Sequence, residues 1–271
     1  MDFKQLYKDI IGLNYSSFYE RWRKFKAIPV RIKHALIFGF GINLENTKNI
    51  KKIPIIINNR NRYTYLLQVI DWLEKYGYAN IYVIDNASTY QPLLDYYSTT
   101  KYKVFRLKEN IGHLALWQTG IIKQFVNNYY IYTDPDILPI EECPGNVIEI
   151  FMQMLKKHEE IEKIGFGLKI DDLPDYYADK EKVLDWEVQF WEKPIEKDLY
   201  DAHIDTTFAL YRPFTDKGPA IKAYRTGGKY MAHLLPWYED SKNPTEENIY
   251  YKNHIKKGAS HWINMESEPD N

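Results

Sequence analysis

From residue 53 onward, short runs of β-branched and aromatic residues alternate with stretches in which apolar residues recur at helical spacing. The first runs are apolar throughout, which is typical of strands buried on both faces of a parallel sheet. Strands that alternate with helices imply right-handed crossovers, so the pattern predicts an α/β fold with a mostly parallel sheet flanked by helices. The predicted strands are 53–57, 81–84, 102–107, 129–133 and 164–169, and the predicted helices are 63–76, 91–97, 115–127 and 146–159.

The alternation divides the chain of 271 residues into three parts. Residues 1–50 precede the first strand, and residues 51–140 hold the regular strand and helix units. Residues 141–271 lose the alternation after residue 171 and become rich in Tyr, Trp, Pro and charged residues. Because ligands of open α/β sheets bind beyond the carboxyl ends of the strands, we expect 51–140 to bind a ligand and 141–271 to form an irregular closing half of the same domain.

A basic and aromatic stretch occupies residues 18–40. It carries six Lys and Arg residues against one Glu, and Phe, Tyr and Trp stand between them. This composition fits a segment that lies in the interface of an anionic membrane, so we expect peripheral membrane association through residues 18–40. An ordinary pair of amphipathic helices packed on the body of the protein is the alternative.

Overall composition excludes several classes of protein. The 36 Lys and Arg residues balance 37 Asp and Glu residues to a net charge of -1, which gives no general attraction to nucleic acid. The single cysteine, Cys143, excludes an internal disulfide framework and a cysteine-built zinc site. No apolar run approaches the roughly 20 residues of a spanning helix, and the first eight residues do not lead into a signal-peptide core. We therefore expect a cytoplasmic protein, soluble or peripheral to a membrane.

Two carboxylates follow the strand predicted at 129–133. Asp134 and Asp136 are two residues apart in extended chain, so both side chains can project to the same side. Carboxylate oxygens are the ligands that Mg²⁺ and Mn²⁺ prefer, and an ion held there keeps positions open for phosphate oxygens. The pair therefore predicts a site for one hard cation, with a solvated turn as the alternative.

Polar clusters also follow the earlier strands of the 51–140 region. Their order and spacing resemble the nucleotide-sugar half of GT-A glycosyltransferases, most closely the family-two type. The resemblance covers residues 53–140 and implies a GT-A-like fold of Rossmann type. The clusters that carry it are Asn58-Asn59-Arg60-Asn61-Arg62, Val83-Ile84-Asp85-Asn86-Ala87-Ser88, Glu109-Asn110-Ile111-Gly112 and Tyr132-Thr133-Asp134-Pro135-Asp136.

This resemblance implies a nucleotide site built from the four clusters. The carboxylate of Asp85 would accept a hydrogen bond from the N–H of a uracil-like base, and Asp134 and Asp136 would hold Mn²⁺ or Mg²⁺ on the diphosphate. The residues implied to line the nucleotide are Asn58, Arg60, Asp85, Asn86, Asn110, Gly112 and Asp134.

A histidine in the second half is implied to complete the metal site. His233 stands in Tyr230-Met231-Ala232-His233-Leu234-Leu235-Pro236-Trp237, which is similar to the late histidine segment that contacts metal or diphosphate in many GT-A enzymes. Imidazole is a good ligand for Mn²⁺ as well as a general base. A purely structural histidine is the alternative. The basic glycine loop at 225–229 precedes it and either closes over a diphosphate or forms a plain surface turn.

Inverting sugar transfer needs a base that removes the proton of the acceptor hydroxyl. The Glu-Asp dipeptide that family-two enzymes use is not at its usual place, since Glu239-Asp240 comes only after the histidine segment. The remaining carboxylates leave the assignment open. Asp172 and Glu187 are the first candidates and Asp205 is the third, with Asp171 beside Asp172 also available; the alternative for each is a helix cap or a surface carboxylate.

Together these features predict a metal-dependent glycosyltransferase. It would move a sugar from a nucleoside diphosphate sugar, with a UDP-linked donor favoured, to a saccharide or lipid-linked saccharide. The resemblance implies a role in bacterial surface polysaccharide assembly at the inner face of the cytoplasmic membrane. No P-loop and no dinucleotide-binding glycine motif occurs in the sequence. The alternatives are a metal-dependent phosphotransferase or hydrolase, and a non-catalytic nucleotide- or glycan-binding module.

Overall fold

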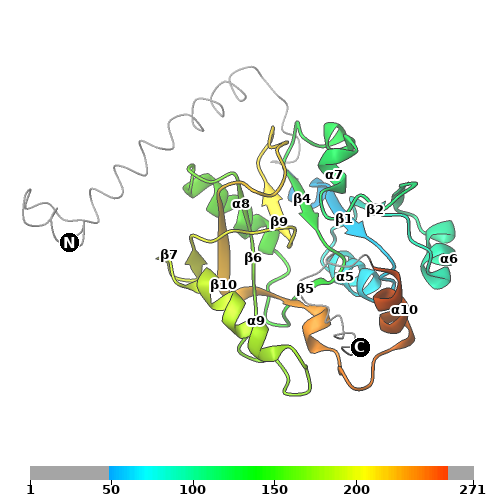
Figure 1. The fold of residues 1–271 in the computed structure, drawn as a ribbon. Helices are drawn as coiled ribbons and strands as arrows, with labels where there is room; N and C mark the ends of the chain where they lie inside the picture. Colours follow the sequence, from blue (N-terminus) through cyan, green and yellow to red (C-terminus); the bar gives the residue numbers. More distant parts are fainter. Residues whose placement is uncertain (1–48, 256–271) are drawn as a thin grey trace, which may run out of the picture.

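A computed structural model describes residues 49–255, which build an α/β fold around one ten-stranded sheet (Figure 1). Four parallel strands come from the region where the sequence alternates regularly, and they lie in the order β3-β2-β1-β4. The prediction of an α/β fold with parallel strands in this region is confirmed. These strands are β1 (Ile55–Asn59), β2 (Ile81–Asp85), β3 (Lys103–Arg106) and β4 (Tyr130–Thr133).

Residues 137–234 continue the same sheet beyond β4, in the order β9-β6-β10-β8-β7, with β5 also paired to β10. Because β9 is antiparallel to both β4 and β6, and β6 is parallel to β10, the long strands β6 and β10 run in the direction of β1 to β4. The second half is thus part of one mixed sheet. Its strands are β5 (Ile137–Pro139), β6 (Lys163–Leu168), β7 (Pro194–Glu196), β8 (Leu199–Tyr200), β9 (Ala209–Tyr211) and β10 (Ala223–Leu234).

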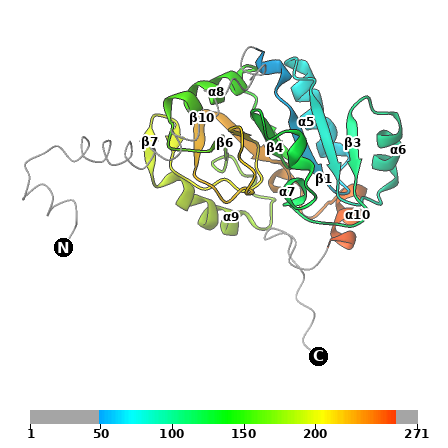
Figure 2. The same cartoon turned by 90° about the horizontal axis from the view of Figure 1, so that it is seen from above.

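Helices cover both faces of the sheet, and each face has its own apolar core (Figure 2). Alternation along β1 shows the division, since Ile55 and Ile57 belong to the core under α5, α6 and α8 while Ile56 belongs to the core under α7. The helices are α5 (Thr64–Lys75), α6 (Gln91–Thr99), α7 (Ala115–Gln118), α8 (Val147–Lys157), α9 (Lys180–Glu187) and α10 (Glu246–His254). Short 3₁₀ helices lie at Ile50–Lys52, Ile121–Gln124, Val188–Trp191 and Leu235–Tyr238.

The prediction of one continuous helix over 115–127 is wrong. It forms as α7 and a separate 3₁₀ helix, Ile121–Gln124, with Gly120 between them in the left-handed region at φ 73°. A left-handed residue cannot continue a right-handed helix, and glycine adopts that conformation without the usual steric cost. The other predicted helices form within a few residues of their expected ends.

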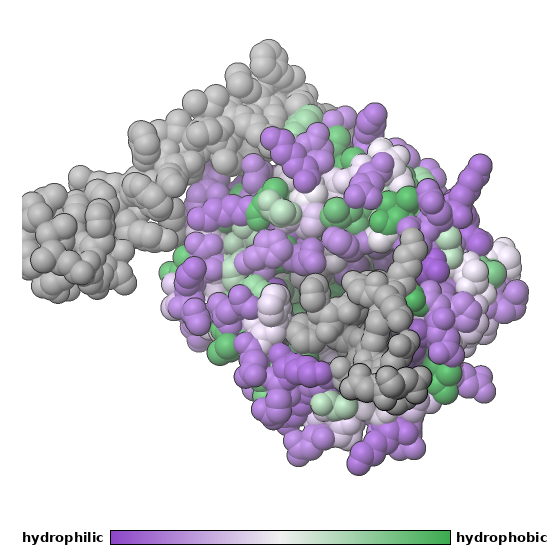
Figure 3. Space-filling view, in the orientation of Figure 1, coloured by the Kyte–Doolittle hydropathy of each residue, from purple (hydrophilic) through white to green (hydrophobic). Residues whose placement is uncertain are grey.

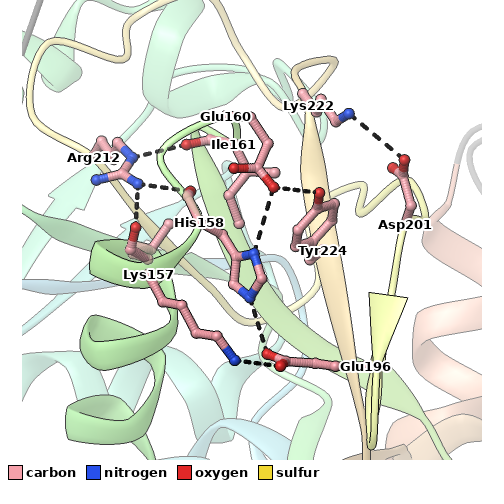
Figure 4. Close-up of polar contacts among 10 residues, drawn as sticks. Lys157, His158, Glu160, Ile161, Glu196, Asp201, Arg212, Lys222 and Tyr224 are labelled. Atoms are coloured by element: carbon pink, nitrogen blue, oxygen red, sulfur yellow. Dashed lines mark hydrogen bonds and ion pairs between the residues drawn. The ribbon is translucent and has the colours of Figure 1, made fainter. Parts of the chain in front are cut away.

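At the amino ends of β6 and β10 a polar cluster holds the edge strand β7 to the loop after α8 (Figure 4). His158 lies between two carboxylates: its Nε2 is 2.9 Å from Oε1 of Glu196 and its Nδ1 is 3.4 Å from Oε1 of Glu160. The hydroxyl of Tyr224 donates to Glu160 at 2.7 Å. The guanidinium of Arg212 donates to the carbonyls of His158 and Ile161, so the loop is fixed on both sides.

The outer surface of the described residues is mainly hydrophilic on the face shown in Figure 3, where apolar residues are scattered among polar ones. No helix within residues 49–255 is long and apolar enough to cross a membrane. The segment 18–40, for which the sequence suggests membrane association, lies outside the described residues.

Candidate functional site

The two aspartates predicted to bind metal follow β4 directly. Their backbone is held from two sides: the N–H of Asp134 donates to the carbonyl of Thr206 at 3.1 Å, and the carbonyl of Asp136 accepts from the N–H of Leu235 at 2.9 Å. The Thr206 hydroxyl also donates to a carboxylate oxygen of Asp134. These hydrogen bonds anchor the pair at the carboxyl end of β4. Both aspartates are half-buried.

Charge at this pair is poorly balanced. Burial raises the pKa of Asp134 well above its ordinary value, the charge of Asp136 raises it further, and the hydrogen bond from Thr206 opposes them only in part. Burial also raises the pKa of Asp136, against the attraction of Arg62. Oδ1 of Asp136 is buried and has no hydrogen-bond partner among the described residues. A divalent cation between the carboxylates would relieve both the repulsion and the missing contact.

Four of the polar residues predicted to line a nucleotide form one hydrogen-bond network at the neighbouring strand ends. The Asn86 amide donates to Oδ1 of Asn58 at 2.9 Å and to the carbonyl of Gly112 at 2.8 Å. The N–H of Gly112 donates to the Asn110 side chain at 2.9 Å, and Gly112 itself has a left-handed φ of 86°. The structure thus brings Asn58, Asn86, Asn110 and Gly112 together from β1, β2 and the loop after β3.

The other two residues predicted on this side hold the loop after β2. Asp85 is fully buried, lies 2.6 Å from Nε of Arg106 and accepts from the N–H of Ser88. Arg60 donates to the carbonyl of Asn86 at 2.6 Å. In this structure, therefore, Asp85 and Arg60 contact protein groups that shape the loop, and Asp85 does not face solvent.

The C-terminal helix α10 reaches the same edge through Arg62, which sequence reasoning did not single out. Arg62 is 6% exposed, donates to Oδ1 of Asn248 at 2.6 Å and stacks on the ring of Tyr251 at 3.6 Å. The Glu247 carboxylate caps α5 by accepting from the N–H of Thr64 at 2.9 Å. Contacts across more than 180 residues leave no local pattern in the sequence, apart from the polar turn that contains Arg62.

His233 and Asp172, predicted for different roles, contact each other. Nε2 of His233 is 3.2 Å from Oδ2 of Asp172, and the hydroxyl of Tyr238 donates to Oδ1 of the same carboxylate. Burial tends to raise the pKa of Asp172, but the hydrogen bonds from Tyr238 and His233 outweigh it, and the pKa is lowered. The neighbouring Asp171 accepts from Lys169 at 2.6 Å on the surface.

Glu187 forms a buried ion pair with Arg225, in which Oε2 of the carboxylate accepts from Nη1 at 2.8 Å. Nε of the same guanidinium donates to the carbonyl of His203. Burial raises the pKa of Glu187 and the charge of Arg225 opposes this rise. The pair therefore ties α9 to β10, and Glu187 is occupied by a structural contact.

Asp205, the third candidate base, lines an open cavity of about 480 Å³ between the start of α7 and the loop at 203–220. The Trp117 side chain forms part of the wall, together with polar side chains that include His113 and His203. Asp205 is exposed and directly precedes Thr206, the residue that holds Asp134. Asp205 thus connects the cavity to the segment that holds Asp134.

No arrangement of three or more His, Cys, Asp or Glu side chains suited to a metal ion occurs within residues 49–255. In comparisons with known proteins, no family model matches the chain and no curated protein matches it.

Proposed function

We propose that the protein is a metal-dependent glycosyltransferase of GT-A type that uses a nucleoside diphosphate sugar, with a UDP-linked donor favoured. The observation that carries this proposal is the pair Asp134 and Asp136, whose partly buried negative charge is balanced only in part. The hydrogen-bonded strand ends around Asn58, Asn86 and Gly112 stand beside it. A cation site next to polar side chains at the carboxyl ends of parallel strands suits a nucleoside diphosphate.

The cation, Mn²⁺ or Mg²⁺, would rest on Asp134 and Asp136 and take its remaining ligands from water and diphosphate oxygens. Such an ion supplies charge that stabilises the leaving diphosphate. The Thr206 hydroxyl keeps one oxygen of Asp134 oriented. His233, whose Nε2 faces Asp172 in this structure, stays a prediction as a further ligand.

As the base that removes the acceptor proton, we favour Asp205 over Asp172 and Glu187, the first candidates from the sequence. Asp205 is exposed, lines the cavity and lies near enough to Asp134 for its charge to raise the pKa of that carboxyl, so a sugar hydroxyl in the cavity could give up its proton there. Glu187 is occupied by Arg225, and Asp172 by His233 and Tyr238. The Trp117 ring with polar groups around it is the kind of surface on which a saccharide acceptor packs.

Calorimetry with UDP, GDP, dTDP and CMP, first with Mn²⁺ and then with excess chelator, tests the proposal. We expect metal-dependent binding of one nucleoside diphosphate, and loss of that binding in Asp136→Asn. Asp171→Asn is the matched control, because Asp171 lies on the surface and pairs with Lys169. Binding without metal would favour a non-catalytic binding module, and no binding at all would favour the hydrolase or phosphotransferase.

The acceptor is proposed to be a saccharide or a lipid-linked saccharide at the inner face of the cytoplasmic membrane. The basic aromatic stretch at 18–40 supports the lipid-linked form. Co-sedimentation of the full chain with anionic vesicles tests it against a variant in which Arg21, Arg23 and Lys24 become Glu. Equal binding of the two proteins would remove the support for membrane association.

A further inference from the structure

Lys163, the first residue of β6, is a lysine with no exposed surface. Its Nζ donates to the carbonyl of Ile204 at 2.5 Å, to the carbonyl of Asp205 at 3.1 Å and to the hydroxyl of Tyr211 at 3.2 Å. An ammonium group has three N–H donors, so these contacts use all of them. All three acceptors are neutral oxygen atoms.

The two carbonyl groups belong to the segment that leads into the candidate site. Ile204 and Asp205 immediately precede Thr206, which binds Asp134 through both its carbonyl and its hydroxyl. Asp205 itself lines the cavity. Lys163 thus stands behind the segment that holds the carboxylate of Asp134 through Thr206 and presents the carboxylate of Asp205 to the cavity.

Burial of an amine costs free energy, which an apolar side chain of similar length would avoid. Here burial lowers the pKa of Lys163 to about 7, and the charge of Arg225 acts in the same direction. The carboxylate of Asp205 opposes them. A neutral amine still offers two N–H groups for the two carbonyls and can accept from Tyr211, so these contacts persist on both sides of that pKa.

We infer that Lys163 is a positioning residue for the proposed transfer, which fixes residues 204–206 and through them the orientation of Asp134 and Asp205. The inference rests on the proposed function. It assigns to the amine a role in cation affinity, although the hydrogen bonds of Lys163 reach neither the aspartate pair nor the polar strand ends around Asn58 and Asn86.

Replacement of Lys163 by Met in the full chain tests this inference, because Met keeps the length of the stem and removes the N–H donors. UDP binding is measured by calorimetry over a series of Mn²⁺ concentrations. Loss of groups that orient metal ligands costs about 10- to 100-fold in metal affinity, so we expect the Mn²⁺ requirement to rise at least about ten-fold. Any UDP binding that remains in chelator should be unchanged.

Two variants separate positioning from general damage to the core. Tyr211→Phe removes only the third acceptor and leaves both carbonyl contacts, so it should keep the wild-type Mn²⁺ requirement. Lys222→Met removes a partly exposed lysine one residue before β10 and should do the same. Thermal unfolding defines the temperature range in which each variant is folded, and all titrations are made within it.

A folded Lys163→Met protein with a wild-type Mn²⁺ requirement would overturn the inference and leave the proposed function standing. If Lys163→Met does not fold, Lys163→Gln is titrated instead; its shorter amide does not span both carbonyls, and the same rise is expected. Failure of the wild-type protein to bind any nucleoside diphosphate would overturn the proposed function, and this inference with it.

Discussion

Partly buried carboxylates lie at both ends of the strands, but in different surroundings. At the carboxyl ends of the strands, Asp134 and Asp136 repel each other and their pKa values are raised. At the amino ends, Glu196 contacts Lys157 and His158, and although burial opposes it, these hydrogen bonds lower its pKa. Burial alone therefore does not distinguish a site from a structural contact. What distinguishes the site is incomplete compensation of its charge by neighbouring groups, because a bound cation would then stabilise the ionised carboxylates.

The ion pair of Glu187 and Arg225 extends the contrast to the interior. Both side chains are almost fully buried, more so than the site aspartates. Yet the two opposite charges lie 2.8 Å apart and compensate each other. Such a pair needs no ligand to complete it. Its cost appears only when one partner is removed.

The largest expected effect is that of Asp134→Asn. The neutral amide removes a metal ligand, so we expect metal-dependent UDP binding to fall by more than about 100-fold. The same change removes repulsion within the pair, so stability at neutral pH should rise, because the raised pKa of Asp134 marks an ionised form that folding disfavours. Calorimetry and urea unfolding measure the two effects.

The sign of the stability change is a strict test of the charge balance. A carboxyl group whose pKa is raised on folding destabilises the protein as pH rises from its unfolded value through its folded value. The advantage of Asp134→Asn over the wild type should therefore grow from pH 4 to pH 7. A variant that loses both metal binding and stability would show that the pair is balanced after all.

Much of the fold could be predicted because local chemistry decides it in the first half. The apolar runs at β1, β2 and β4 are short and rich in β-branched and aromatic residues, which favours buried strands, and the apolar faces of α5 and α8 match their helical spacing. Polar residues just beyond such strands meet at one edge, which is why the cluster of Asn58, Asn86 and Gly112 forms as expected.

The remaining features depend on contacts between distant segments. Nothing in the sequence around Asp172 indicates that β10 brings His233 to it, or that α10 brings Asn248 to Arg62. The strands of the second half are short or interrupted, and their pairing, such as that of β9 between β4 and β6, is set by the rest of the sheet. Periodicity carries no information on such pairing.

Arg225→Met is expected to have the next largest effect. It leaves the buried Glu187 without its partner, which typically costs about 3 kcal/mol or more in the free energy of unfolding. Urea unfolding measures this loss, and the double variant Glu187→Leu, Arg225→Met should recover most of it. UDP binding in the folded protein should be unaffected; a change in the Mn²⁺ requirement would instead place the ion pair within the site.

A smaller effect, dependent on pH, is expected for Lys163→Met. Burial lowers the pKa of Lys163 from 10.5 to about 7, with Asp205 opposing and Arg225 assisting. Above pH 7 the unfolded chain then binds a proton that the folded protein does not, so wild-type stability rises with pH, by up to about 1.4 kcal/mol per pH unit. Met has no such proton, and the wild type should gain on the variant between pH 7 and pH 9. If the difference in unfolding free energy between wild type and Lys163→Met is the same at pH 7 and pH 9, the lowered pKa of Lys163 is contradicted.

The smallest effect is expected for Glu196→Gln at the amino-end edge. The carboxylate is about one-third exposed and its partner Lys157 is more exposed still, so solvent screening should keep the loss below about 1 kcal/mol at pH 7. Because folding lowers the pKa of Glu196, its contribution is present above the unfolded pKa and disappears as pH falls through the folded value. Wild type and variant should therefore converge below pH 4 in urea unfolding. A difference that persists in acid would mean that the carboxylate acts through its shape and not through its charge, and the contrast between the two edges would then rest on the aspartate pair alone.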